Sequence, residues 1–236
     1  MLRILVHVSA ALSCACLLDG CISLGLHDTA RTAPPGQFEY GGIVDLSCAP
    51  AEEDVPAQAW PWPGLYARVG LSDKSDLGLR WTFDPGIGVD GKYRLASGGV
   101  DVAVRLGASA HYYPYGLFLF EMTSDDVGLF SLSPRVIVSS EPESGLPWTV
   151  NAGVDYNGAF GRYGSGVLNL RAGAGLPFLA GSTRITPEVG VSLPLSTDSD
   201  HFEGAPGFSD QAVMTLGVSV GSVAAAEDEG RWSPGD

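Results

Sequence analysis

The sequence has few basic residues and few cysteines, and both shortages narrow the classes of protein to which it can belong. Of its 236 residues, 13 are Lys or Arg and 27 are Asp or Glu, so the net charge is −14. Such a chain is a poor partner for nucleic acid, because phosphate backbones bind clustered basic residues. Three of the four cysteines lie within the first 21 residues, which leaves Cys48 alone. We therefore expect neither a nucleic-acid partner nor a disulfide framework, and no pattern for a metal or organic cofactor is present.

Long hydrophobic runs are scarce, and the exception lies at the N-terminus. After Arg3, residues 4–18 are almost wholly small or apolar. This run has the length of a signal-peptide core and is too short to cross a bilayer as a helix. It ends in Leu18-Asp19-Gly20-Cys21, which resembles the lipobox of bacterial lipoproteins, although that pattern prefers a small neutral residue at the place of Asp19. The sequence predicts a signal peptide over 1–20 with lipidation at Cys21; the alternative is an ordinary secretory peptide cut nearby.

The remainder of the chain divides into three parts. Residues 21–36 are predicted to form a lipidated tether, residues 37–222 a single domain, and residues 223–236 a polar C-terminal tail. The segment from 36 to 222 has no stretch of helical periodicity of useful length, and the chain contains 32 glycines. This composition is typical of strands packed into a curved, closed sheet.

Hydrophobic residues alternate with polar or small ones in segment after segment. Val102, Val104 and Leu106, for example, alternate with Ala103, Arg105 and Gly107. Strict alternation indicates half-buried strands, because successive side chains of a strand point to opposite faces. The sequence predicts an all-β fold, a closed antiparallel up-and-down transmembrane barrel of 10–12 strands. Eleven segments are recognisable, so twelve strands are preferred over ten because single-chain bacterial barrels usually have an even number.

The apolar face of these segments carries no charge, whereas the other face carries many. Arginine suits a narrow lumen, because its planar guanidinium binds carboxylates bidentately and is weakly hydrated. We expect a network of paired charges that largely fills the interior, which argues against a wide porin. The predicted network consists of Glu39, Arg68, Arg80, Asp101, Arg105, Arg135, Asp155, Arg171, Arg184 and Glu188.

Prolines and connections refine this prediction. Pro134 and Pro187 are expected at strand starts or bulges, because proline removes a hydrogen bond from the ladder. Long loops are predicted over 48–63 and 196–210, and short turns near 73–75, 96–98 and 124–126. Trp60-Pro61-Trp62-Pro63 is placed in the first long loop, as an interfacial anchor or a docking surface. The register of residues 115–122 is undefined, since this run is apolar on both faces.

The sequence resembles the small outer-membrane β-barrel lipoproteins of Gram-negative bacteria. The resemblance lies in Ala30-Arg31-Thr32-Ala33-Pro34-Pro35-Gly36, in residues 73–80 and in Asp90-Gly91-Lys92-Tyr93-Arg94-Leu95, about a quarter of the chain. It implies a membrane barrel in the outer membrane and supplies no activity. One departure is the end of the last strand, Val220-Gly221-Ser222, where many such barrels have an aromatic residue.

Two groups of residues suggest chemistry. Ser109 and His111 share one strand face, and a Ser–His pair is the core of a hydrolase site. Their backbones stand about 6–7 Å apart on a strand, so polar lining of the lumen is the preferred interpretation. Asp198, Asp200, His201 and Glu203 form an acidic loop whose spacing matches no calcium loop.

The function predicted from the sequence is that of a non-enzymatic outer-membrane β-barrel lipoprotein. Its role would be structural, that of a narrow pore, or binding through its loops, with membrane lipid and an unidentified surface or periplasmic molecule as partners. The alternative is a soluble lipid-anchored periplasmic β-protein, a sandwich or lipocalin-like barrel that binds a ligand. A membrane-embedded hydrolase is the third class.

Overall fold

The computed structural model describes residues 28–49, 58–82, 86–113, 127–141, 145–160, 165–198 and 212–223. The regular structure in these ranges is β-strand, and no helix within them is long and apolar enough to cross a membrane. The predicted signal peptide, the lipidation site Cys21, the run 115–122 and most of the acidic loop lie outside the described residues.

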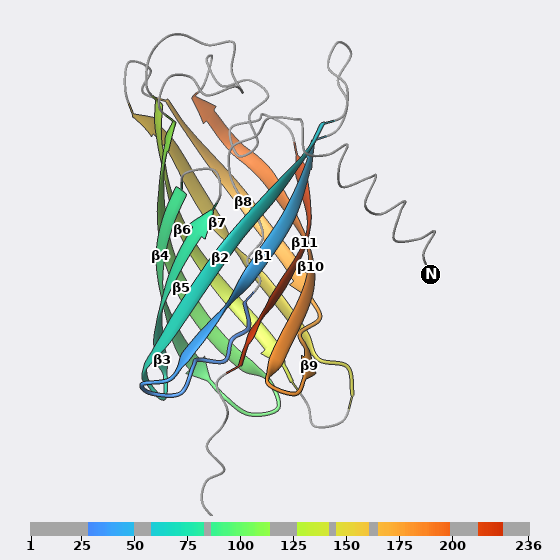
Figure 1. Cartoon of the computed structure of the whole chain (residues 1–236). Helices are drawn as coiled ribbons and strands as arrows, with labels where there is room; N and C mark the ends of the chain where they lie inside the picture. The colour runs from blue at the N-terminus through green and yellow to red at the C-terminus, as the bar shows by residue number, and fades with distance from the viewer. Residues whose placement is uncertain are drawn as a thin grey trace, which may run out of the picture.

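Eleven strands follow one another in the described part of the chain (Figure 1). Their bounds are β1 (Phe38–Ala49), β2 (Gln58–Ser72), β3 (Ser75–Thr82), β4 (Gly86–Ala96), β5 (Asp101–Tyr113), β6 (Val127–Ser140), β7 (Trp148–Phe160), β8 (Ser165–Gly175), β9 (Phe178–Ala180), β10 (Thr183–Asp198) and β11 (Val213–Ser222).

The sheet closes on itself, because β11 pairs with β1 on one side and with β10 on the other. All of these pairings are antiparallel, and each long strand pairs with its neighbours around the barrel. The three residues of β9 pair only with the start of β10, so they continue the line of β8 beyond the interruption at Leu176 and Pro177. The prediction of a closed antiparallel barrel is confirmed. Ten of the described strands form the circumference and not the preferred twelve, because β9 only extends the line of β8 and because β5 and β6 pair directly with each other on either side of residues 115–122.

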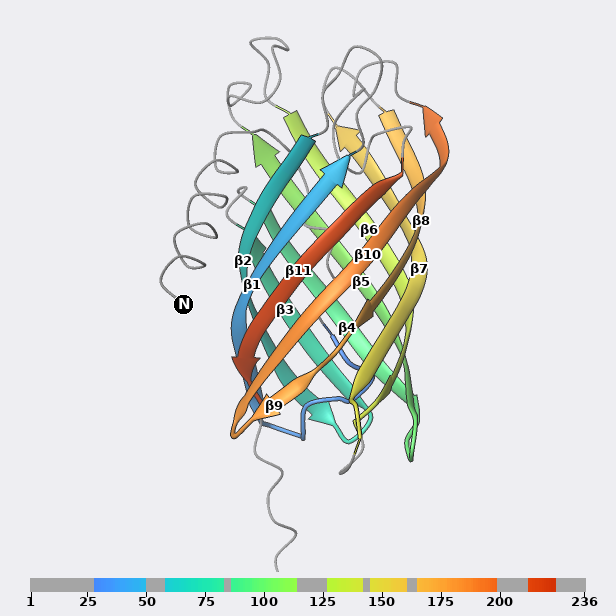
Figure 2. The same cartoon turned by 90° about the vertical axis from the view of Figure 1, so that its right-hand side faces the viewer.

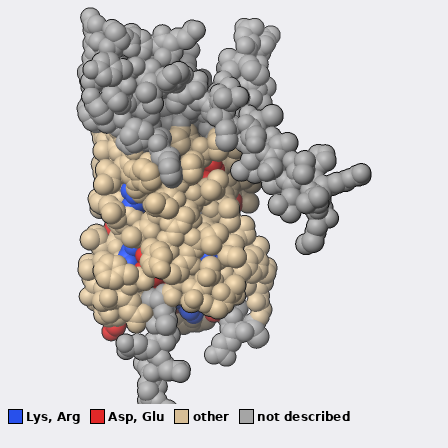
Figure 3. All heavy atoms as spheres, in the orientation of Figure 1, with Lys and Arg blue, Asp and Glu red and all other residues tan. Residues whose placement is uncertain are grey.

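Side chains alternate between an apolar exterior and a polar interior. On β5, Val104 and Leu106 are exposed, whereas Asp101, Ala103 and His111 are buried. None of the described strand side chains that point outward is charged. The face shown in Figure 3 is correspondingly uncharged over most of the barrel wall, with only a few blue and red atoms between the tan ones.

Prolines occupy positions that the sequence analysis did not anticipate. Pro134 and Pro187 lie inside β6 and β10 with no register shift beside them, so their expected placement at strand starts or bulges was wrong. The hydrogen-bonded sheet accommodates these two prolines because each lies next to an interruption in the pairing of its strand with a neighbouring strand. The β6–β7 pairing is interrupted between Leu132 and Arg135, and the carbonyl of Pro187 faces Leu176, where β8 has already ended. A bulge does occur in β10, between Pro194 and Ser196.

The two ends of the barrel differ. The short turn at 73–74, the connection 97–100 and both chain ends of the barrel lie at one end, drawn at the bottom of Figures 1 and 2. The strand ends Ala49, Tyr113 and Asp198, which precede the longer connections, lie at the opposite end, the loop end. The expected loop over 48–63 is shorter than predicted, because β2 begins at Gln58. Trp62 therefore points into the barrel and is 5% exposed, which overturns its placement in an interfacial loop.

Candidate functional site: the charged lumen and the segment that crosses its end

The interior of the barrel holds the charged side chains that the sequence placed there. Arg68, Asp101, Arg135, Asp155, Arg171 and Glu188 are buried, and Glu39, Arg80, Arg105 and Arg184 are partly buried on the same side of the wall. Their inward direction follows from the alternation of side chains along each strand, since every second residue points inward. These ten do not form one network. They divide into groups at different heights, joined by residues that were not predicted.

A central charge cluster connects β6, β7 and β8 and consists of Arg135, Asn151, Asp155 and Arg171. Arg135 donates from Nη2 to both carboxylate oxygens of Asp155, at 3.0 and 2.9 Å, and from Nη1 to Asn151 Oδ1 at 3.2 Å. Arg171 Nε lies 2.6 Å from Asp155 Oδ2. One carboxylate thus holds two guanidinium groups, and a buried ionic group of this kind is stable only when its hydrogen bonds are satisfied.

A lower charge cluster lies nearer the short-turn end and consists of Asp28, Arg68, Asp76, Asp90, Lys92 and Arg105. Arg68 contacts three carboxylates: Asp28 at 3.1 Å, Asp90 at 2.7 Å, and Asp76. Arg105 Nη2 donates to the other oxygen of Asp90 at 2.7 Å. Most of the cluster comes from strands β2 to β5, but Asp28 precedes the first strand.

Residues 28–36, the N-terminal segment, cross the short-turn end of the lumen. Thr29, Ala30 and Ala33 are almost completely buried. The amide of Ala30 donates to Ser139 Oγ at 3.0 Å, and that of Ala33 donates to Asp76 Oδ2 at 3.2 Å. The Thr29 carbonyl accepts from Lys92 Nζ at 3.0 Å. The sequence predicted a tether here, and gave no indication that this stretch packs within the end of the barrel.

Asp28 is the anchor of the N-terminal segment. Its carboxylate lies 2.8 Å from Lys92 Nζ and 3.1 Å from Arg68 Nη2. Burial by itself would raise the pKa of Asp28, but Arg68, Lys92 and Arg105 outweigh burial and lower that pKa to about 2. Asp28 is therefore charged at every physiological pH and holds the segment by ion pairs.

The segment fits closely because one strand residue opposite it is glycine. The amide of Gly36 donates to the Gly70 carbonyl at 2.8 Å, and the amide of Gly70 donates to the Gln37 carbonyl at 3.1 Å. A Cβ at position 70 would overlap the backbone carbonyl oxygens of Ala33 and Pro34. The close approach of two backbones is thus possible only with glycine at this point.

A third group of charges surrounds the rim of the short-turn end. Arg31 of the N-terminal segment lies 3.3 Å from Asp101 and 3.6 Å from Glu141. Arg184 lies 3.6 Å from the same Glu141 and 3.9 Å from Glu39. Half of the Arg31 side chain is exposed, so the two pairs that Arg31 makes orient the segment and contribute little free energy.

Between these clusters the lumen contains small polar cavities. The largest, about 80 Å³, extends from the central charge cluster toward the loop end. One of about 30 Å³ adjoins the lower charge cluster, and one of about 10 Å³ lies behind Arg135 and Arg171. A cavity needs roughly 10–15 Å³ to hold one water molecule. The described interior thus has room for water but no wide continuous channel.

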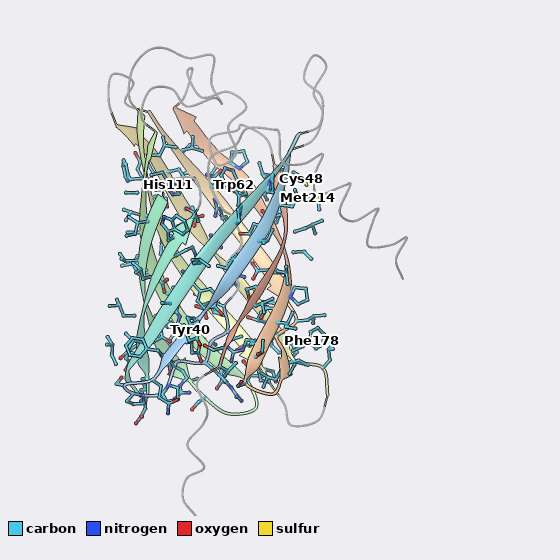
Figure 4. The ribbon with its side chains drawn as sticks, in the orientation of Figure 1. Tyr40, Cys48, Trp62, His111, Phe178 and Met214 are labelled. Carbon is cyan, nitrogen blue, oxygen red and sulfur yellow. The ribbon has the colours of Figure 1, made fainter. Side chains whose placement is uncertain are left out.

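Ser109 and His111 meet at the loop-end side of the large cavity, where Figure 4 labels His111. Ser109 Oγ lies 3.3 Å from His111 Nε2 and 2.7 Å from Ser131 Oγ. The serine hydroxyl is therefore shared between a histidine and a second serine on β6. This arrangement is that of a polar wall, with both side chains inside the lumen and away from the outer surface of the barrel.

Several residues of the site were missed from the sequence. Asp76 and Asp90 have the same strand parity as Arg80 and Lys92, so extending the alternation by a few residues would have found them. Glu141 and Asp28 lie outside the strands, and no periodic pattern predicts their position. Only the three-dimensional closure of the barrel brings them to Arg184 and Arg68.

Comparisons with known proteins concern the architecture. No protein-family model and no curated protein matches the chain. The translocator domain of autotransporter NalP from Neisseria meningitidis is similar in structure, with a TM-score of 0.41 and 13% identity over 79% of this chain and 88% of that one. An outer membrane channel from Pseudomonas putida F1 has a TM-score of 0.41 and 10% identity over 86% of this chain and 100% of that one. Both likenesses are too distant to assign an activity.

Proposed function

We propose that the protein is a non-enzymatic β-barrel of the Gram-negative outer membrane that forms a narrow pore, closed at its short-turn end by the N-terminal segment. The observation that carries the proposal is the uncharged apolar exterior of all the long strands. Leu106 is 63% exposed, Met214 57% and Ile87 56%, and they belong to three different strands. In water such a surface would be unfavourable by about 25 cal/mol per Å², whereas in hydrocarbon it is the expected surface.

The dimensions of the strands support a transmembrane position. β5 has 13 residues. At about 3.4 Å per residue and a tilt near 45°, a strand of that length spans roughly 30 Å along the barrel axis. This matches the hydrocarbon core of a bilayer, about 30 Å thick.

The soluble alternative requires the opposite distribution of side chains. A lipocalin-like barrel or a sandwich keeps its apolar side chains inside and meets water with its polar ones. Here Asp45, Asp155 and Arg171 are buried inside, while Leu79, Val89 and Leu216 are about half exposed outside. A ligand-binding soluble protein is therefore not the favoured function.

A closed resting state follows from how the lumen is filled. The central and lower charge clusters cross the interior at two heights, and the N-terminal segment covers the end below them. Each cluster member is held by a short hydrogen bond or ion pair from another strand. Solutes larger than water or a small ion would have to break these contacts, so we expect a low conductance.

Export and anchoring complete the proposal. The N-terminal sequence supports cleavage before Cys21 and lipidation of that residue, with the barrel in the outer membrane. Replacing Cys21 with serine should abolish incorporation of a labelled fatty acid, while Cys48→Ser should leave the labelling unchanged. Labelling that survives Cys21→Ser would contradict processing at this site.

The pore proposal is tested by electrical recording on the folded protein. The membrane fraction is extracted with detergent, and folding is verified by faster gel migration before boiling than after it. In planar bilayers the wild type should show rare, small current steps, and removal of residues 28–36 should raise both their frequency and their size. Large, stable, unselective channels from the wild type would refute a closed lumen, and unchanged currents after the deletion would refute closure by the N-terminal segment.

A further inference from the structure

The largest cavity of the lumen has a wall that is richer in cations than in anions. Its volume of about 80 Å³ accommodates several water molecules or one small ion. Four guanidinium groups line it, from Arg80, Arg105, Arg135 and Arg171, together with His111. Two carboxylates, Asp90 and Asp155, line the same wall. The wall therefore holds more guanidinium groups than carboxylates.

Both carboxylates are already engaged with arginine. Asp90 accepts from Arg68 and Arg105, each at 2.7 Å. Asp155 accepts from Arg135 and lies 2.6 Å from Arg171 Nε. Glu188 lines only the small cavity on the far side of Arg135 and Arg171, and Asp45 lines neither. Both carboxylates of the cavity wall are thus engaged with arginine.

An unused donor points to a ligand at this place. Arg171 is 5% exposed, and its Nη2 has no hydrogen-bond partner among the described residues. A buried charged donor without a partner costs about 1–3 kcal/mol or more. An anion in the cavity that this side chain lines would supply the missing acceptor through a charge-assisted hydrogen bond.

Neutral donors complete the wall. Ser109 and Ser131 stand on neighbouring strands with their hydroxyl oxygens 2.7 Å apart, and both line the cavity. Guanidinium groups on one side and hydroxyl groups on the other match the oxygens of a tetrahedral anion, each of which accepts hydrogen bonds. We propose that this cavity binds a small inorganic oxyanion, phosphate or sulfate, through Arg135, Arg171 and the two serine hydroxyls.

The proposal concerns the interior of the folded barrel and does not require that the barrel conduct. The full chain is folded in detergent, its folding is verified by heat-modifiable migration, and it is titrated calorimetrically with sodium phosphate and, separately, sodium sulfate. We expect saturable binding with one site, and the ratio of the two affinities identifies the preferred anion. Sodium chloride at equal ionic strength corrects for general screening.

Three variants test the assignment. Arg171→Gln should weaken binding at least tenfold, and Ser109→Asp should weaken it similarly because it adds a negative charge to the wall. Arg184→Gln is the matched control, since it removes a lumen arginine that pairs with Glu39 and Glu141 at the other end, and it should bind as the wild type does. A folded wild type without saturable binding would overturn the proposal, as would equal losses in Ser109→Asp and Arg184→Gln. If Arg171→Gln does not fold, the Ser109→Asp result decides.

Discussion

Gly70 determines, as a single residue, whether the N-terminal segment can lie across the end of the lumen. Its hydrogen bonds to Gly36 and Gln37 hold two backbones together without any intervening side chain. Strand β2 itself does not need glycine here, because β-branched residues favour strands. Substitution of Gly70 thus separates docking of the segment from folding of the barrel.

We predict that Gly70→Val folds as a barrel but releases the N-terminal segment. The new side chain would overlap the carbonyl oxygens of Ala33 and Pro34, so the segment must leave. Trypsin should then cleave after Arg31 in the folded variant and not in the wild type. Gly91→Ala is the control, because a Cβ at this exposed position meets nothing within 4 Å. Equal protection of Arg31 in all three proteins would contradict the close fit.

Asp28 gives the docking of the segment a pH dependence. Its pKa is lowered from 3.8 to about 2, and a lowered carboxyl pKa stabilises the docked state above the unperturbed value. The stabilisation, about 2 kcal/mol by the size of the shift, is fully present above pH 4 and is lost as the pH falls through 2. The charged groups around Asp28 are the cations of Arg68, Lys92 and Arg105 and the carboxyl groups of Asp76 and Asp90.

Hydrogen exchange of the Ala30 and Ala33 amides measures this effect. After correction for the intrinsic pH dependence of exchange, protection should fall between pH 4 and pH 2 in the wild type. Asp28→Asn should lose roughly thirtyfold in protection at pH 7, as about 2 kcal/mol implies, and should respond less to acid. A variant as well protected as the wild type at pH 7 would show that these ion pairs do not hold the segment.

At the scale of elements, the strands were predictable and the N-terminal segment was not. Alternation assigns an inward or outward direction to each strand residue, so Leu106 and Arg105 could be placed from the sequence. The buried position of Ala30 depends on Ser139, more than one hundred residues away in the chain. No local pattern encodes such a contact. The count of strands erred at residues 115–122, the eleventh recognised segment, because β5 and β6 on either side of it pair directly with each other.

The outward face of β5 and the connection before β7 offer a matched pair of leucines. Leu106 is 63% exposed within the belt, and Leu146 is 61% exposed in the connection at the short-turn end. In a soluble protein an arginine would be tolerated at both positions. In a membrane barrel Leu106→Arg should cost roughly 2–4 kcal/mol near the midplane, and much less near the interface.

We therefore predict that Leu106→Arg lowers the yield of heat-modifiable protein in the membrane fraction, while Leu146→Arg assembles normally. The readout is the ratio of the folded to the boiled band for each variant at equal expression. Normal assembly of both variants would favour the soluble alternative.

At the scale of the whole molecule, the barrel is apolar outside and ionic inside. The charged side chains that hold the interior together are therefore of the kind that a membrane excludes. The apolar side chains on the outside are of the kind that water disfavours. The central claim follows from this inversion. We propose that the outer wall contacts lipid acyl chains and that the inner wall does not.

Two tryptophans test that claim most directly, because they lie on opposite sides of the wall. Trp81 of β3 is 42% exposed and points outward, and Trp62 of the adjacent β2 is 5% exposed and points inward. Two variants are prepared, each retaining one of these tryptophans, with all others replaced by phenylalanine, and each is folded into bilayers that contain phospholipids with brominated acyl chains. Bromine quenches indole fluorescence on contact, so Trp81 should be strongly quenched and Trp62 only weakly. Equal quenching of the two, or no quenching of Trp81 in a correctly folded protein, would contradict the membrane-spanning barrel.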